Sequence, residues 1–130
     1  MIQRYRAFYE GKMYGVKAVI WTSRGLYVTL DEGNKAGRRV RSAKLMQSTG
    51  LFDTFHQDEL FEDDVILWTY FDEFEDSGNA RIVYRDGCWK LLDVKTGKEV
   101  WDSLFDCLEN CNVYLAGNIY ENPELVEEGK

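Results

Sequence analysis

The 130-residue sequence has one histidine, one proline and three cysteines, and it lacks any long hydrophobic run. No stretch approaches the roughly 18 apolar residues of a membrane helix, so we expect no membrane association. Residues 1–6 lack the apolar segment of a secretory signal peptide, which predicts a cytoplasmic protein. Cys88, Cys107 and Cys111 are an odd number without the spacing of a disulfide framework. They are therefore predicted to be reduced thiols.

The scarcity of histidine also limits catalytic chemistry. His56 is the single histidine and no nucleophile-elbow motif is present, so a Ser-His-acid site is not expected. A phosphate-binding loop is not expected either, because Gly33 and Gly37 lack the Lys-Ser/Thr continuation. His56 and the cysteines could supply four zinc ligands, but no C-x-x-C knuckle exists, and Cys107 and Cys111 lie four apart on an expected amphipathic helix. We predict metal-free thiols, no cofactor and no enzymatic activity.

One acidic cluster offers a distant alternative, a metal-dependent enzyme that uses the loop at residues 58–64. Its members are Asp58, Glu59, Glu62, Asp63 and Asp64. Paired carboxylates can bind a divalent cation or act as acid and base. No nucleophile, lysine or histidine set accompanies them, and their spacing fits no known metal-binding loop. A solvated loop or a subunit contact is the favoured interpretation.

Apolar residues are abundant, with 45% hydrophobic and 15% aromatic, which suffices for the core of one domain or two small subdomains. Short strand-like segments bounded by turn residues recur along the chain, including a hairpin about Asp86-Gly87. Residues 99–111 place apolar side chains at helical spacing. This pattern predicts a mostly β fold, a small barrel or sandwich of SH3-like or related type, with one amphipathic helix. The polar loop at residues 31–42 is the candidate boundary between two β subdomains.

The net charge of −7 is unevenly distributed. Residues 1–50 hold ten Lys/Arg against three Asp/Glu, giving +7, whereas residues 51–130 hold six against twenty, giving −14. Five bases fall within ten residues without an intervening acid, and they are the candidate contact residues: Lys35, Arg38, Arg39, Arg41 and Lys44. The asymmetry indicates either a cationic face for an anionic partner or docking of the basic half of one subunit on the acidic half of another.

Nucleic-acid association through residues 35–44 is the alternative function. Phosphate contacts from such a cluster give salt-sensitive, non-specific affinity. The acidic charge of the whole chain and the lack of interleaved aromatic residues for base stacking count against it. Contact with a neighbouring subunit is therefore favoured for the basic segment.

Several segments carry a family resemblance, the clearest being residues 117–127, GNIYENPELVE. Four further segments carry it: residues 4–8 (RYRAF), 45–53 (LMQSTGLFD), 59–66 (ELFEDDVI) and 81–89 (RIVYRDGCW). They follow one another along the chain in the order that the family shows. Together they resemble the YopX-like family of small phage and prophage proteins, over almost the whole chain. In the tail, Asn122 can cap a helical turn through its side-chain oxygen, and Pro123 suits the first helical position.

The chain departs from the family pattern at two places in its central loop. Residues 55–58, FHQD, replace the usual Asn-Gly turn and are one residue longer. Asp63 stands where the family usually has glycine, which adopts positive φ more freely. The resemblance implies one mostly β domain over residues 1–130, a phage or prophage origin, the cytoplasm of a bacterial host, and self-assembly. We predict a non-enzymatic homo-oligomer that binds an unidentified phage or host macromolecule.

Overall fold

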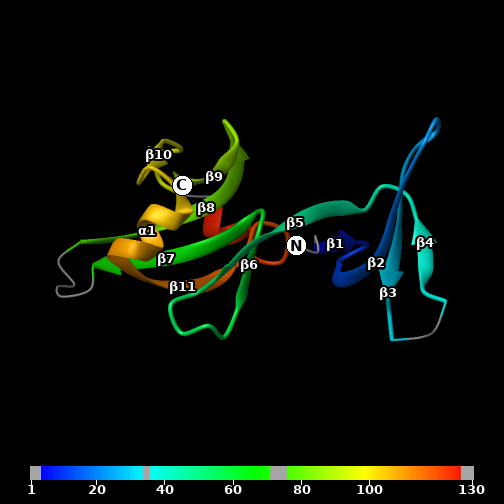
Figure 1. Ribbon diagram of the computed structural model, residues 1–130, viewed down its shortest axis with the longest axis horizontal. Coiled ribbons are helices and arrows are strands. Elements are labelled where there is room, and N and C mark those ends of the chain that lie inside the picture. The colour runs from blue at the N-terminus through cyan, green and yellow to red at the C-terminus, as the bar shows by residue number, and fades with distance from the viewer. Residues whose placement is uncertain (1–3, 34–35, 71–75, 127–130) are drawn as a thin grey trace. The chain divides into compact units, whose positions relative to one another are not determined.

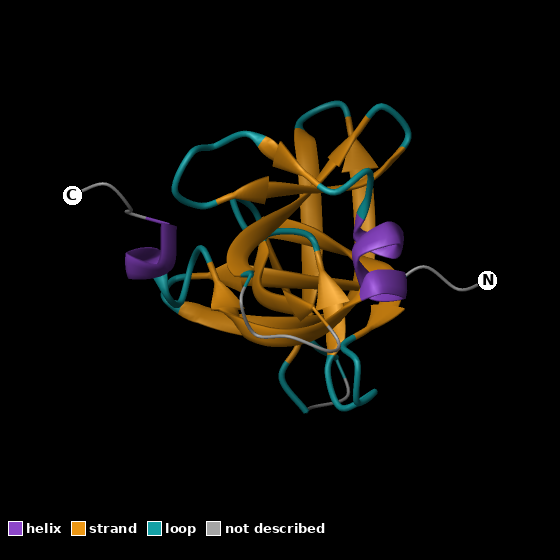
Figure 2. Ribbon diagram, turned by 90° about the vertical axis from the view of Figure 1, so that its left-hand side faces the viewer, coloured by secondary structure: helices purple, strands orange, loops and turns teal. Residues whose placement is uncertain are grey.

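The computed structural model describes residues 4–33, 36–70 and 76–126, which form two antiparallel sheets, one α-helix and one short 3-10 turn (Figures 1 and 2). Strands dominate, and within these described ranges helix is confined to α1 (Leu104–Asn110) and the C-terminal turn η1 (Pro123–Val126). The expected mostly β fold with one helix and a C-terminal helical turn is therefore confirmed. Within the described ranges both sheets have open strand orders, and neither closes into a barrel.

The chain divides into two compact units, residues Met1–Ser48 and Thr49–Lys130. The division falls within strand β5 (Lys44–Phe52), whose first residues pair with β1 (Tyr5–Tyr9) in unit 1. The loop at residues 31–42 lies inside unit 1, because it contains β4 (Arg38–Val40), which pairs with β3 (Gly25–Asp31). That segment therefore contributes a strand to unit 1, and the units divide after Ser48.

Unit 1 contains the strand order β4-β3-β2-β1-β5, in which β2 spans Lys12–Thr22. Residues that alternate along the strands share one apolar face, with Ala7, Val28, Leu30 and Val40 buried in its core. Only residues 12–15 of β2 pair with β1, and only residues 28–30 of β3 pair with β4. The rest of the β2–β3 hairpin is therefore a two-stranded ribbon, which extends past its neighbours in Figure 1.

Unit 2 holds a five-stranded sheet in the order β10-β9-β8-β7-β11. The strands of this sheet are β7 (Asp64–Tyr70), β8 (Ser77–Arg85), β9 (Cys88–Asp93), β10 (Glu99–Val100) and β11 (Cys111–Asn118). Unit 2 also contains α1 (Leu104–Asn110), η1 (Pro123–Val126) and β6 (Glu59–Phe61), which lies beside β5 in the other sheet. The predicted hairpin about Asp86-Gly87 is confirmed, since both residues have positive φ, 53° and 82°, as a type I′ turn requires. Helix α1 packs Leu104 and Cys107 into the core with Ile66 and Val113.

The helix is shorter than the residues 99–111 that the sequence predicted. Ser103 caps its N-terminus, with the side-chain oxygen accepting a hydrogen bond from the backbone N–H of Asp106 at 3.0 Å. Residues 99–100 instead pair with β9 as β10, and Trp101 takes a positive φ of 63° that ends any helix there. At the other end Cys111 is extended and begins β11 directly. Residues 99–100 thus form a strand, because they hydrogen-bond to β9, although their apolar spacing fits a helix.

Candidate functional site

The basic segment of unit 1 is held largely by contacts within the unit. Arg38 donates two hydrogen bonds to Glu32, each of 3.1 Å, and one of 3.2 Å to the hydroxyl of Tyr14. Its guanidinium also lies over the rings of Tyr9 and Tyr14, 5.5 and 5.8 Å from the ring centres. These contacts tie β4 to β1 and β2 through one side chain. Arg38 therefore has a structural role that its place in a charged run did not reveal.

Arg41 is engaged in a similar way. It donates a hydrogen bond of 3.0 Å to the backbone carbonyl of Arg24 and lies over the Tyr27 ring at 5.4 Å. It therefore links the end of β4 to the β2–β3 hairpin. An arginine combines charge with a flat stacking surface, which explains the three aromatic contacts that Arg38 and Arg41 make.

Arg39 and Lys44 are the candidate residues that remain available to a partner. Both are exposed, and across the three described ranges neither side chain makes a hydrogen bond or an ion pair. Arg39 alternates with the buried Val40, and Lys44 alternates with Leu45, which packs on the core. Both basic side chains consequently project from the face of the sheet opposite the core of unit 1. Lys35 lies outside the described residues.

The charge asymmetry of the sequence coincides with the structural division. Unit 1 carries all ten bases of the N-terminal half and its three acids, a net +7, and unit 2 carries −14. The sequence placed this change of sign near residue 50, and the compact units divide between Ser48 and Thr49. The two units are thus oppositely charged bodies within one chain.

The C-terminal motif forms a locked turn around Asn118, which is 5% exposed. The side-chain oxygen of Asn118 accepts hydrogen bonds from the N–H groups of Tyr120, at 3.0 Å, and Glu121, at 2.8 Å. Its side-chain nitrogen donates to the Glu121 carboxylate at 2.8 Å. Asn122 faces backwards, accepting a hydrogen bond from the backbone N–H of Asn118 at 3.2 Å. The expected forward cap by the Asn122 side chain is therefore wrong, although Pro123 does begin the predicted turn.

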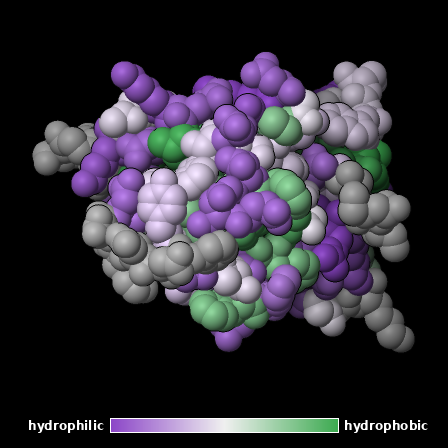
Figure 3. Space-filling model, turned by 60° about the vertical axis from the view of Figure 1, so that its left-hand side comes forward, coloured by the Kyte–Doolittle hydropathy of each residue, from purple (hydrophilic) through white to green (hydrophobic). Residues whose placement is uncertain are grey.

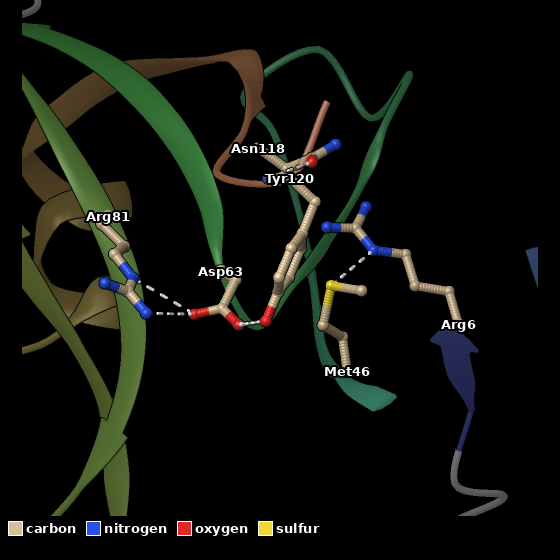
Figure 4. Close-up of polar contacts among 6 residues, drawn as sticks. All are labelled: Arg6, Met46, Asp63, Arg81, Asn118 and Tyr120. Carbon is tan, nitrogen blue, oxygen red and sulfur yellow. Dashed lines mark hydrogen bonds and ion pairs between the residues drawn. The ribbon is translucent and has the colours of Figure 1, made fainter. Parts of the chain in front are cut away.

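A polar cluster within unit 2 connects this motif to the central loop (Figure 4). Arg81 donates two hydrogen bonds to one oxygen of Asp63, at 2.9 and 3.2 Å, and the Tyr120 hydroxyl lies 3.4 Å from the other. Burial and the neighbouring Asp63 carboxylate raise the pKa of Tyr120, so its hydroxyl remains a donor. Figure 4 also shows a contact within unit 1, where Arg6 Nε lies 3.4 Å from Met46 Sδ.

Asp63 explains how the chain tolerates its departure from the family pattern. Its φ of 70° lies in the left-handed region, which glycine adopts most easily and which Asp tolerates better than most residues. His56, in the other divergent loop, also has positive φ, 56°. Both divergent loops therefore contain a residue other than glycine in the left-handed conformation.

The acidic loop uses several of its carboxylates for structure. Asp63 bonds Arg81, and the buried Asp64 accepts a hydrogen bond of 2.8 Å from the N–H of Phe61. The adjoining Asp53 accepts hydrogen bonds from the N–H groups of Gln57 and Asp58. Among the residues that the structure describes, no three His, Cys, Asp or Glu side chains are grouped as metal ligands.

A surface groove in unit 2 was not anticipated from the sequence. It has a volume of about 310 Å³ and lies between the loop that follows β5 and helix α1. Phe52, the last residue of β5, and His56 of the following loop line one side, and Phe105 and Leu108 of the helix line the other. Phe105 and the nearby Phe55 are each 59% exposed. In the sequence, Phe52 precedes a polar loop and Phe105 precedes a polar residue of the helix. The pattern of apolar residues did not distinguish these two exposed side chains from core residues.

The thiols lead to a direct prediction. All three cysteines are free, with Cys107 and Cys111 buried and Cys88 partly accessible. Burial, then the neighbouring Cys111 thiol and Asp106 carboxylate, raise the pKa of Cys107, and burial raises that of Cys111. Because only thiolates react readily, we expect Cys88 alone to react with a disulfide reagent at pH 8 in the folded protein, and all three in urea. Zinc that resists dialysis would contradict the prediction of metal-free thiols.

Comparisons with known proteins agree with this architecture. The model of the YopX protein family matches residues 4–127. The crystal structure of protein EF1440 from Enterococcus faecalis has a TM-score of 0.71 at 24% identity, covering 98% of this chain and 99% of that one. Protein yopX from Bacillus subtilis has a TM-score of 0.65 at 19% identity, covering 95% and 98%. No curated protein matches the chain. At these identities the two solved structures are informative about the fold.

In the described part of the chain, no helix is long and apolar enough to cross a membrane. Figure 3 shows apolar green areas interspersed with hydrophilic purple side chains on the face that it draws. Such a mixed surface is ordinary for a protein in water, and it directs attention to local features such as the groove.

Proposed function

The chain belongs to the YopX protein family, and we propose that it is a non-enzymatic protein that assembles with copies of itself and binds another macromolecule. In this assembly the basic unit 1 of one copy contacts the acidic unit 2 of the next. The family resemblance supports a phage or prophage origin, with the cytoplasm of a bacterial host as the setting. The phage or host macromolecule bound by the assembly is the part of the proposal that rests on this resemblance alone.

The observation that carries the proposal is the coincidence of charge and structure. A unit of +7 and a unit of −14 lie in the same chain, so two copies attract each other when unlike units meet. The exposed Arg39 and Lys44 are the basic side chains best placed to contribute. Arg38 and Arg41 support the contact indirectly, because they hold the strands of unit 1 together.

These roles determine which residues to change in a test. Replacing Arg38 or Arg41 would disturb unit 1 itself, so the informative variant is Arg39→Glu with Lys44→Glu. We expect it to weaken assembly, measured by sedimentation velocity, with added salt weakening the wild type in the same direction. Each exposed pair contributes only about 0–1 kcal/mol, so dissociation should be partial and the fold unchanged.

A charge-matched control separates local contact from net charge. Lys95→Glu with Lys98→Glu changes the total charge equally but at exposed positions of unit 2, and it should leave assembly intact. A wild-type monomer at micromolar concentration and physiological salt would contradict the proposal. If the Arg39/Lys44 variant stays assembled but is no longer retained on DNA or heparin, the basic segment serves a nucleic acid instead.

A further inference from the structure

An exposed tryptophan marks the end of the β2–β3 hairpin in unit 1. Trp21 is 76% exposed, and it lies opposite Leu26 across the two strands. Two residues before Trp21 on the same strand, Val19 pairs with the buried core residue Val28. Because alternate residues of a strand share a face, Trp21 lies on the same face of the hairpin as the core of unit 1. A large aromatic side chain held on a two-stranded ribbon in water is typical of a contact residue.

The charge of this hairpin has one sign. Residues 11–30 contain Lys12, Lys17 and Arg24 and no Asp or Glu. Arg41 adds a second guanidinium at the hairpin end, through its hydrogen bond to the Arg24 carbonyl. The hairpin end is therefore an apolar knob flanked by positive charge.

The groove of unit 2 has the complementary character. Phe52, Phe105 and Leu108 supply apolar walls, and the cavity of about 310 Å³ is at the small end of the range for ligand pockets, about 300–1,000 Å³. The residues that line it include Asp53 and Glu109 and no Lys or Arg. Glu109 lines the groove and is exposed.

The groove is also preformed, which reduces the entropic cost of filling it. The loop backbone is fixed by hydrogen bonds from Thr54 N–H to the Val113 carbonyl, at 3.0 Å, and from His56 N–H to the Asp53 carbonyl, at 3.0 Å. The Val113 N–H donates in return to the Thr54 hydroxyl at 2.6 Å. The loop wall of the groove is therefore ordered without a bound partner.

We propose that the hairpin end of one copy, with Trp21 as its anchor, inserts into the Phe52–Phe105 groove of a second copy. This rests on the proposed self-assembly and names the contact that makes it specific. Charge complementarity selects a second copy as the occupant, because the only charged side chains of hairpin residues 11–30 are basic, whereas Asp53 and Glu109 line the groove in a unit of net charge −14.

The contact joins two different surfaces, so it propagates from copy to copy and gives a ring or a filament. This property allows a test with two complementary variants. Trp21→Ser removes the knob and keeps the groove, whereas Phe105→Lys blocks the groove and keeps the knob. Both positions are exposed, so both variants should fold normally, as circular dichroism and thermal unfolding can check. Tyr84→Ser, at an aromatic position that is 56% exposed outside the groove, is the control.

In sedimentation velocity, each single variant should raise the concentration for half-assembly by about tenfold or more, and Tyr84→Ser should not. An equal mixture of the two variants should form 1:1 dimers and nothing larger, because the pair retains one intact knob and one intact groove.

Two outcomes would overturn the inference while leaving self-assembly standing. One is wild-type-like assembly of either variant. The other is a mixture that remains monomeric although each variant is dissociated, which would mean that the knob and the groove have other occupants. A monomeric wild type would instead overturn the proposed function itself.

Discussion

Replacing Gly117 by alanine should lower the free energy of unfolding by about 3 kcal/mol, at the upper end for an overpacked site. A Cβ atom at this position would overlap the Asn122 side-chain amide and lie 2.9 Å from Leu125 Cδ1. The C-terminal turn would have to move away from β11, and the hydrogen bond from Asn118 N–H to Asn122 would be lost. Urea unfolding followed by circular dichroism measures the effect.

A second glycine provides a matched control for this substitution. Gly15 also lies in a strand, but a Cβ there would meet Asp31 Cβ at 3.6 Å, an ordinary contact. Gly15→Ala should therefore change the free energy of unfolding by no more than about 0.5 kcal/mol. Equal unfolding midpoints for the Gly117 and Gly15 variants would show that the tail does not pack on Gly117. The glycine that begins the C-terminal motif thus serves close packing.

Changing Asp63 to alanine should also cost about 3 kcal/mol. The variant loses the ion pair with Arg81 and the Tyr120 contact, worth about 2 kcal/mol because Arg81 is partly exposed. Alanine tolerates the φ of 70° less well than Asp, which adds about 1 kcal/mol. The measurement is again the urea-unfolding free energy.

Asp63→Gly distinguishes these two causes. Glycine loses the same side-chain contacts but relieves the backbone, so it should be about 1 kcal/mol more stable than Asp63→Ala. A double-mutant cycle with Arg81→Gln isolates the ion pair. If the glycine and alanine variants have equal stability, positive φ imposes no cost at this turn and the side-chain contacts account for the whole effect.

The first two predictions concern the C-terminal motif, which contains Gly117, and the central-loop residue Asp63, which this motif contacts through Tyr120. Asn118 joins β11 to the C-terminal turn, and Tyr120 joins that turn to the central loop through Asp63. In this chain the motif therefore closes the C-terminal end of unit 2. Positions that determine function are better sought outside it, on the hairpin end and in the groove.

Local rules were sufficient for several features of this chain. Alternating apolar residues predicted strands, since a strand must bury one face, and Asp86-Gly87 predicted its hairpin because both residues accept positive φ. The opposite charges of the two halves were readable by counting, and they coincide with the two compact units. Each of these inferences depends on neighbours in sequence or on composition, which a single sequence contains in full.

Other features depend on residues that are distant in sequence. The helix begins at Leu104 because residues 99–100 find hydrogen-bonding partners in β9, and periodicity alone cannot anticipate this competition. In the basic segment, Arg38 and Arg41 are held by contacts with aromatic rings and, for Arg41, with a distant backbone carbonyl. Arg39 and Lys44 remain exposed. The groove brings the loop after β5 next to a helix about fifty residues later. The sequence determined which residues were apolar or charged, and only tertiary contacts decided which of them remain exposed to a partner, because burial depends on packing between segments far apart in the chain.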